Sequence, residues 1–285
     1  LINMKKLLLV LLLLLPVMVT AKKETNVRWC TFNIRLIHSE DTKAGFGWDL
    51  RKSRVAQYIL DNDLDVVGMQ EVLHKQLTYL QENLEGYDYI GVGRTDGKTK
   101  GEYTCIFNKK DKYEVLDQGN FWLSETPDVP GSKGWDAALE RVATWGKFRD
   151  KKTGKIFMAV NTHFDHIGIE ARKQSALLII EKIREIVGNK PAVVTGDFNI
   201  TDQNEAYKTM VSNKFVLKDA YKISPSHGGV HYSFNNYGRI PVEKRSKIDF
   251  IFVTPNIDVI RTGIPMDVQT HSLSDHNPHW ADLKF

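Results

Sequence analysis

The sequence has few of the features that stabilise very small domains. It contains two cysteines in 285 residues, so at most one disulfide can form and no disulfide framework supports the fold. Cys30 and Cys105 both lie in alternating segments typical of strands, which favours buried free thiols over a disulfide. The chain also lacks repeats, low-complexity tracts and long linkers. We therefore expect a single domain over residues 22–285 with a sizeable hydrophobic core.

The sequence also has no large excess of positive or negative charge. The 39 Lys and Arg residues and the 35 Asp and Glu residues leave a formal net charge of +4. Removal of Lys5 and Lys6 with a leader segment would lower this charge to +2. A balance this mild does not by itself indicate a nucleic-acid partner.

A long hydrophobic run occurs near the start of the chain. It covers Leu7–Leu15, follows the basic pair Lys5-Lys6 and leads into small residues that end at Ala21. This order is typical of a secretory signal peptide, and the run is shorter than the roughly 20 residues that span a bilayer. We expect residues 1–21 to be a signal peptide. The protein would then be exported, periplasmic or secreted, with no stable membrane span after cleavage.

The rest of the chain contains short β patterns with a few amphipathic helices between them. Apolar alternation or short apolar runs predict strands at residues 27–34, 65–70, 87–92, 102–108, 141–148, 156–163, 192–198, 248–253 and 278–285. Helical spacing predicts helices at 50–60, 72–84, 169–187 and 205–211, with Asp49 as an N-cap and Gly188 as a stop. Strands outnumber helices, which indicates a mixed α/β protein with two packed sheets and helices outside them.

Polar residues that suit catalysis fall where these strands begin or end. They are Asn33, Glu71, His163, Asp197, Asn199, Asp249, Asp275 and His276. Strand ends project into loops at a sheet edge, where sites are commonly built. Carboxylates gathered there repel one another unless a cation or protons lie among them. Carboxylate and amide oxygens suit Mg²⁺ or Mn²⁺ better than Zn²⁺, so we predict a Mg²⁺ site at which Mn²⁺ substitutes.

Taken alone, each of these residues has a simpler interpretation. Asn33 could be a turn residue, and Asp197 could form an Asx-turn beside Gly196. An Asp-His pair in a loop, such as Asp275-His276, is common. The prediction of a site therefore depends on the whole set and on its order.

That order resembles the endonuclease/exonuclease/phosphatase superfamily, the DNase I-like group. Segments Phe121–Ser124 and Arg141–Trp145 are similar to those of an exported bacterial branch, and the chain is broadly similar to the deadenylase group. The motifs of the superfamily occur in order through nearly all of residues 22–285: Thr31-Phe32-Asn33-Ile34-Arg35, Gln70-Glu71, Asn161-Thr162-His163, Gly196-Asp197-Phe198-Asn199, Ile248-Asp249-Phe250-Ile251-Phe252 and Ser274-Asp275-His276.

The resemblance implies a four-layer α/β/β/α sandwich with the site where loops of the two sheets meet. It also implies roles for the motif residues. Glu71 would be the principal metal ligand, with Asn33 and Asp275 near the same ion. Asp197 would orient or deprotonate the attacking water, and Asp249 would orient a histidine. The remaining motif residues would bind the phosphate and stabilise its charge: Asn199, His163 and His276.

Four further residues are predicted at or behind the site on weaker grounds. Glu102 falls where some superfamily members pair a glutamate with the motif histidine. Arg141 is a candidate phosphate contact, although a strand-edge arginine is the simpler interpretation. His166 directly follows Asp165 and could reach the substrate. Trp122 could line the cleft, or it could pack in the core.

The sequence leaves the substrate open among three functions. The first is a phosphodiesterase or nuclease, such as a 3′–5′ exonuclease; the second is a phosphatase or phosphodiesterase for small sugar, inositol or lipid phosphates; the third is a non-catalytic binding module. A nuclease needs a basic groove, and aromatic residues such as Trp135, Phe234 and Tyr237 could line one. Three basic clusters could form it: Lys98, Lys100, Lys109 and Lys110; Lys147, Arg149, Lys151 and Lys152; Lys244, Arg245 and Lys247. We expect a monomer that binds a phosphoester, with nucleic acid or a nucleotide as one possibility.

Overall fold

The computed structural model describes residues 24–212, 216–266 and 272–285. The predicted signal peptide at residues 1–21 lies outside these ranges, so export stays a prediction. Among the helices of the described ranges, none is long and apolar enough to cross a membrane.

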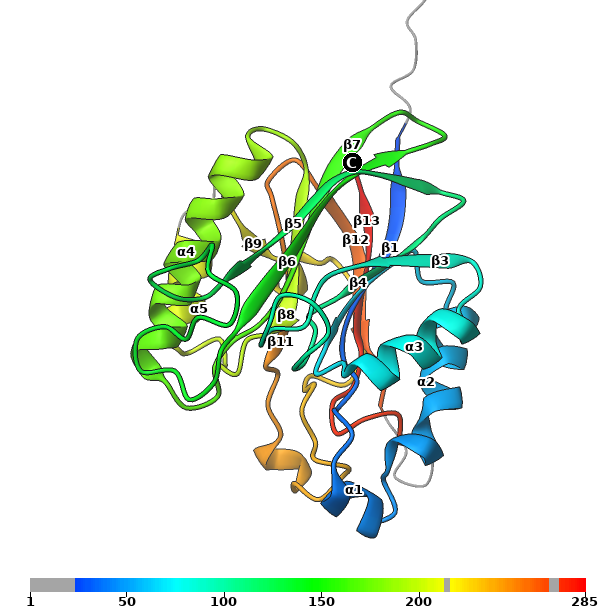
Figure 1. The fold of residues 1–285 in the computed structure, drawn as a ribbon. Coiled ribbons are helices and arrows are strands. Elements are labelled where there is room, and N and C mark those ends of the chain that lie inside the picture. The colour runs from blue at the N-terminus through cyan, green and yellow to red at the C-terminus, as the bar shows by residue number, and fades with distance from the viewer. Residues whose placement is uncertain (1–23, 213–215, 267–271) are drawn as a thin grey trace, which may run out of the picture.

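Two β-sheets lie face to face (Figure 1). The first has the strand order β10-β12-β13-β1-β2-β4-β3, and the second has the order β5-β6-β7-β8-β11-β9. In the first sheet the strands are β1 (Asn26–Asn33), β2 (Val66–Gln70), β3 (Tyr87–Ile90), β4 (Ile106–Lys109), β10 (His227–Gly229), β12 (Asp258–Ile264) and β13 (His279–Lys284). In the second they are β5 (Tyr113–Trp122), β6 (Val142–Asp150), β7 (Ile156–His163), β8 (Ala192–Asp197), β9 (Lys218–Asp219) and β11 (Asp249–Val253).

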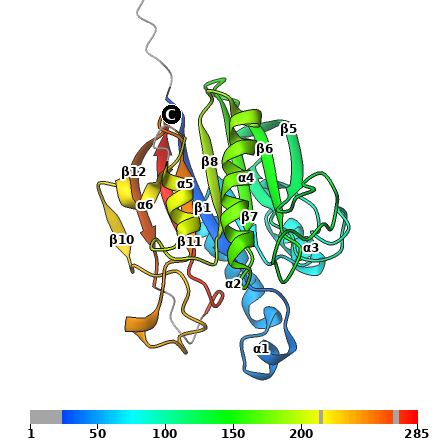
Figure 2. The ribbon, with the colours of Figure 1, turned by 90° about the vertical axis from the view of Figure 1, so that its left-hand side faces the viewer.

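The longer helices cover the outer faces of the sheets. Helices α2 (Trp48–Asp61) and α3 (His74–Asn83) pack on the first sheet, while α4 (Ile169–Val187) and α5 (Glu205–Ser212) pack on the second (Figures 1 and 2). The short helices are α1 (Ser39–Lys43), α6 (Ala220–Ile223) and the 3₁₀ turn η1 (Val242–Lys244). These layers confirm the predicted α/β/β/α sandwich.

Strand alternation divides the buried apolar residues among three cores. On β1, Val27 and Trp29 face the core between the sheets, whereas Cys30 and Phe32 face α2 and α3. On β7, Phe157 and Ala159 face the central core, and Met158 faces α4. Successive strand residues point to opposite faces, so residues two apart share one face. Each strand therefore carries one row of side chains into the space between the sheets.

The structure confirms the predicted helices and strands, with shifted boundaries. Helix α4 covers the predicted residues, and Gly188 follows it with a positive φ of 58°. The prediction that Asp49 is the N-cap was wrong, because Gly47 occupies the N-cap position and Asp49 lies in the first turn of α2. The β4 strand starts at Ile106 instead of residue 102. Both cysteines are buried free thiols, as predicted.

Candidate active site

The strand register brings several predicted site residues together. His163 at the end of β7 pairs with Asp197 at the end of β8, and Asp197 pairs with Asp249 at the start of β11. On the facing sheet, Asn33 at the end of β1 pairs with Gln70 at the end of β2. Each of these residues is two or four positions from an apolar residue of the central core, so each side chain points between the sheets.

A buried polar layer separates this site from the apolar core below it. The Gln70 side-chain amide donates to Thr31 Oγ1 at 3.0 Å and to Asn161 Oδ1 at 2.7 Å, and so connects the sheets. Thr195 Oγ1 donates to the same Asn161 oxygen at 3.0 Å. Gly68 makes room for this layer, because a Cβ there would lie 2.3 Å from Thr195 Oγ1. The layer gives the site a rigid base.

Three residues at the site have a left-handed backbone that is uncommon outside glycine. They are Arg35, Glu71 and Asn199, with φ values of 59°, 60° and 51°. In a regular continuation of β2, Glu71 would point to the face opposite that of Gln70. The change of backbone direction brings its carboxylate to the site instead. Such strain costs on the order of 1–3 kcal/mol per residue and is concentrated at functional sites.

Asn33 connects the two carboxylates nearest to it. Its amide nitrogen donates to Glu71 Oε1 at 3.0 Å and to Asp197 Oδ2 at 2.9 Å, while its oxygen accepts from the Arg35 backbone N–H. The Arg35 guanidinium lies 3.8 Å from both Glu71 and Asp275 and donates to Asp41 at 2.8 Å. Since the Asn33 oxygen has a backbone partner, its predicted role as a direct metal ligand stays a prediction.

Asp249, His276 and Asp197 are ionisable side chains that lie in a row, with His276 between the two carboxylates. His276 Nδ1 lies 2.8 Å from Asp249 Oδ2, and His276 Nε2 lies 3.7 Å from Asp197 Oδ2. Burial lowers the pKa of His276, but Asp249 and Asp197 raise it to about 10 overall. His276 is therefore an imidazolium at neutral pH. Burial and the nearby Asp249 raise the pKa of Asp197 to about 7, which suits a group that accepts a proton.

His163 is neutral, in contrast to His276. Burial lowers its pKa well below the usual value, and the positive charge of Arg141 lowers it further. Its Nε2 lies 3.1 Å from the Asn199 side-chain nitrogen and 3.4 Å from Asp197 Oδ2. Because the Asn199 amide is a donor, Nε2 accepts and Nδ1 carries the hydrogen. Within the described part of the chain, this buried Nδ1 has no hydrogen-bond partner, so it can donate to a ligand.

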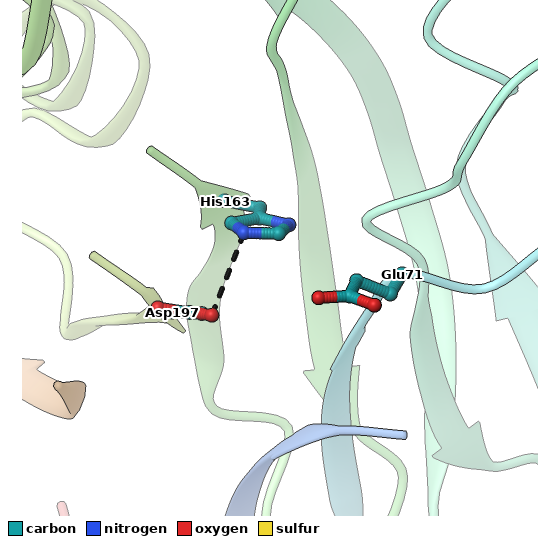
Figure 3. A group of neighbouring side chains, drawn as sticks. All are labelled: Glu71, His163 and Asp197. Carbon is teal, nitrogen blue, oxygen red and sulfur yellow. Dashed lines mark ion pairs between the residues drawn. The ribbon is translucent and has the colours of Figure 1, made fainter. Parts of the chain in front are cut away.

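Glu71 faces His163 and Asp197 from the opposite sheet (Figure 3). One donor atom from each of these three residues lies within 4.8 Å of the others, and the same holds for Asp197, Asp249 and His276. Burial, followed by the nearby Glu71, raises the pKa of Asp275 above its usual value. Buried carboxylates this close together are stabilised by a cation, and their oxygen donors fit Mg²⁺ or Mn²⁺.

The site opens into a cavity of about 360 Å³. The predicted residues that line it are Glu71, Glu102, Arg141, His163, His166, Asp197, Asn199, Asp275 and His276. Asn33 and Asp249 lie behind this lining and contact it through the hydrogen bonds above. Of the twelve predicted residues, Trp122 alone neither lines the cavity nor contacts a lining residue through its predicted role.

Two of the weaker predictions need correction. Trp122 does not line the cavity: it is buried, and its indole donates to the Arg94 carbonyl at 2.6 Å. Glu102 lies 3.9 Å from His163 Nδ1, too far for a hydrogen bond. It pairs instead with Arg94 through two contacts of 2.7 and 2.8 Å. A buried arginine attracts the carboxylate more strongly than a neutral histidine does.

Three residues that shape the cavity had no role predicted from the sequence. Arg94 and Arg35 supply positive charge to its wall, and Asp165 supports Arg141 from behind. Arg35 and Asp165 adjoin the Asn33 and His163 motifs, so proximity to a motif could have identified them. Arg94 lies in an irregular segment after β3 and leaves no such signal in the sequence.

The chain is similar to solved structures over most of its length. It is 60% identical to an endonuclease/exonuclease/phosphatase from Bacteroides vulgatus, covering 91% of this chain and 98% of the other with a TM-score of 0.89. It is 42% identical to a mannosyl-6-phosphatase from Bacteroides thetaiotaomicron, covering 91% of this chain and 100% of the other with a TM-score of 0.86.

Curated relatives match with lower identity. A Ccr4 3′–5′-exoribonuclease subunit from Debaryomyces hansenii is 24% identical over 82% of this chain and 34% of its own length. Nocturnin from Drosophila melanogaster is 28% identical over 58% of this chain and 26% of its own length. Two uncharacterised mimivirus proteins match over 65% and 35% of their length, so the chain spans less than two thirds of these relatives.

The fold and the acidic, histidine-containing site define a metal-dependent phosphoester hydrolase. The family model for endonucleases, exonucleases and phosphatases matches residues 30–276. The chain therefore belongs to the endonuclease/exonuclease/phosphatase family, whose members are divalent-metal-dependent phosphoester hydrolases. The predictions of this superfamily and of an enzyme are confirmed.

Proposed function

We propose that this protein is a Mg²⁺-dependent phosphatase for small phosphate esters, with a sugar phosphate as the substrate. The observation that carries the proposal is the shape of the site: one small cavity whose wall contains both the hydrolytic residues and arginine. Its volume of about 360 Å³ is near the lower end of the range for ligand pockets, which suits a monosaccharide phosphate.

The surroundings of the cavity argue against a polynucleotide substrate. None of the basic residues in the three clusters predicted from sequence lines it. Lys109 is held by Asp65 at 3.0 Å, Lys151 donates to the Lys110 carbonyl, and Lys247 is paired with Asp219 at 3.2 Å. These lysines therefore serve as structural ion pairs or surface charge rather than as a track for successive phosphates.

Aromatic residues give the same indication. Phe234 is the aromatic side chain other than histidine that lines the cavity, and its ring packs against His276 at 4.9 Å between centroids. Tyr237 is buried and stacks on Phe46. Single-strand recognition uses aromatic faces on which successive bases stack, and the described lining offers one such ring. The activity in the name of the similar mannosyl-6-phosphatase supports the same substrate class.

The hydrolysis follows from the positions of the side chains. Asp197 accepts a proton from a water molecule as the water oxygen forms a bond to phosphorus. The P–O bond to the sugar breaks in line, and the leaving alkoxide takes up a proton from solvent. His276 and neutral His163 donate hydrogen bonds to the phosphoryl oxygens as charge develops. Asn199 holds His163 in place, because its amide donates to His163 Nε2 and to the Phe164 carbonyl. A Mg²⁺ ion held by Glu71 and Asp275 would supply Lewis acidity at the same phosphate.

A nuclease is the second candidate. The names of the Ccr4 relatives favour it, and the cavity is open to solvent on one side. An oligonucleotide end could enter where a sugar phosphate does. This alternative predicts activity on polymers that the phosphatase lacks.

A direct comparison of substrates tests the proposal. Purified protein is assayed with Mg²⁺ on hexose phosphates, nucleoside monophosphates and single-stranded oligonucleotides with free or blocked 3′ ends. We expect release of inorganic phosphate from hexose phosphates and no cleavage of oligonucleotides into shorter products. The Asp197→Asn variant is the blank, with expected loss of at least roughly a thousandfold in kcat. Cleavage of oligonucleotides without turnover of sugar phosphates would replace the proposal with the nuclease.

A further inference from the structure

Arg141 has an unusual environment for a charged residue. It precedes β6 and is 4% exposed, yet it lines the cavity. Its Nε lies 3.4 Å from Asp165 Oδ2, and its Nη2 lies 3.0 Å from His166 Nδ1. Its Nη1 is buried, and within the described ranges of the chain it has no hydrogen-bond partner. One edge of the guanidinium is thus occupied by protein, and a further donor atom is left for a ligand.

Asp165 holds this arginine in a fixed position. One carboxylate oxygen accepts the backbone N–H groups of Ile167 and Gly168 at 2.9 and 2.8 Å, at the start of α4. The other oxygen accepts from Leu139 N–H at 3.2 Å and faces Arg141 Nε. The aspartate therefore joins α4, the segment before β6 and the guanidinium.

Arg141 keeps one donor atom, Nη1, without a partner in the described part of the chain, although carboxylates lie nearby. Burial lowers the pKa of Arg141, and the neighbouring Arg94 lowers it further. The carboxylates of Glu102, Asp165 and Asp197 raise it in part. Glu102 contacts Arg94 at 2.7 Å and so neutralises that residue. A buried charged donor without a partner is costly, and an anion that enters the cavity removes this cost.

We propose that Arg141, positioned by Asp165, selects substrates that carry a terminal phosphate over phosphodiesters. This inference rests on the proposed function and names the residue that defines its substrate class. A phosphomonoester has three non-bridging oxygens and up to two negative charges, whereas a diester has two such oxygens and one charge. Nη1 binds the third oxygen. In a diester a second carbon substituent occupies that position, and the donor stays without a partner.

The discrimination follows a general rule. A site built to hydrogen-bond one substrate atom rejects an analogue that lacks the atom, because its own polar group is then buried and unpaired. Arg141 would therefore be a catalytic residue that touches the phosphate. Asp165 would be a positioning residue that acts through Arg141.

The test compares a hexose 6-phosphate with its methyl phosphodiester. We expect Arg141→Gln to lower kcat/KM for the monoester on the order of 100-fold and to change that for the diester by less than about threefold. Inhibition by inorganic phosphate, which has the same terminal oxygens, should weaken by a similar factor. Arg149→Gln is the matched control, because Arg149 lies on β6, is exposed and pairs with Glu114.

A double-mutant cycle separates positioning from stability. Asp165→Asn should lower monoester kcat/KM, and adding it to Arg141→Gln should cause little further loss if it acts through the arginine. If the losses in kcat/KM of the two single variants multiply in the double variant, Asp165 does not act through Arg141 and the positioning role is wrong. If Arg141→Gln fails to fold, Arg141→Lys replaces it, since lysine keeps the charge but loses the rigid fork, and the same selective loss is expected.

The outcomes distinguish this inference from the proposed function. Equal loss of monoester and diester turnover in a folded Arg141 variant would overturn the inference and leave the phosphatase standing. Absence of turnover of hexose phosphates by the unmodified protein would overturn the proposed function. Asp197→Asn should abolish hydrolysis of both substrates in either case.

Discussion

At the scale of single residues, Asp249 determines the charge of the imidazole in front of it. Its carboxylate lies 2.8 Å from His276 Nδ1 and, together with Asp197, raises the pKa of His276 to about 10 although burial opposes this. A protonated His276 donates to the phosphoryl oxygens, so activity that depends on it should persist to alkaline pH and fall as pH rises through the pKa.

Asp249→Asn should therefore move the alkaline limb of the pH–rate profile to lower pH. The amide cannot stabilise the imidazolium as a carboxylate does, so the pKa of His276 should fall and the charge should be lost earlier. The measurement is kcat against pH at saturating Mg²⁺. Asp258→Asn, on the exposed start of β12, is the control. An alkaline limb that stays in place would show that His276 does not act as an imidazolium.

Glu71 should determine metal affinity more than chemistry. Glu71→Gln is expected to weaken Mn²⁺ binding by roughly tenfold or more, because an amide replaces the charged oxygen donor that faces Asp197. Activity at low Mg²⁺ should fall and should recover in part at high Mg²⁺. Binding is followed by Mn²⁺ electron paramagnetic resonance, with exposed Glu82→Gln on α3 as the control. Unchanged Mn²⁺ affinity would contradict the ligand role.

The sequence was sufficient to predict most of the residues that the structure brings together at the cavity, but not how they pair. Most motif residues lie at a strand end, and Asp275 and His276 lie in the loop before β13. Alternation with core residues was visible in the sequence. The sequence could not show whether His163 or His276 is the partner of Asp249, because this depends on which strands are neighbours in the folded sheet. The pairing of Glu102 with Arg94 also depends on a loop conformation that no periodicity encodes.

At the scale of the elements, predictions succeeded where strands have a buried face. The strands β7, β8 and β11 are almost fully buried and read as apolar runs. The edge strand β5 was missed because most of its side chains are partly or fully exposed, which removes the alternation that marks a strand. The strands β12, β10 and β9 and helices α1 and α6 were missed as well. All but β12 are short elements of at most five residues that tertiary contacts hold in place.

The polar layer between the two sheets is an element-scale device that the sequence did not reveal. Asn161 donates to the Met69 and Cys105 carbonyls and accepts from Gln70 and Thr195. It thus satisfies four buried groups, including three on strands or loops of the facing sheet. The layer aligns the ends of β2 and β7, which carry Glu71 and His163 respectively.

Asn161→Ala should destabilise the protein by about 2–4 kcal/mol, because it leaves buried donors and acceptors without partners. Urea denaturation measures this change. The variant should also lose activity at temperatures where it remains folded, since Glu71 and His163 would no longer be held at a fixed separation. Asn189→Ala, at an exposed position after α4, is the control. A loss below about 0.5 kcal/mol would contradict the structural role of the layer.

At the scale of the whole molecule, burial of neutral histidine makes the fold sensitive to acid. His279 at the start of β13 is fully buried, and its imidazole lies 2.9 Å from Thr262 Oγ1. Burial, and then the charge of Lys247, lower its pKa to about 3. The unfolded chain binds a proton at this residue below about pH 6.5, whereas the folded chain does not.

The free energy of unfolding should therefore fall as pH is lowered from about 6.5 toward 3, with a slope of up to about 1.4 kcal/mol per pH unit from this residue. His279→Gln removes the titrating group and keeps a polar side chain that can contact Thr262. Its stability should be lower than that of the unmodified protein near pH 7, and it should change less between about pH 6 and about pH 4. Urea denaturation across this range measures the difference. The difference between the two curves of unfolding free energy against pH isolates His279, because His163 and the carboxylates titrate in both proteins.

If the two curves are parallel, His279 accepts a proton in the folded state. The acid sensitivity of the fold would then come from the other buried groups.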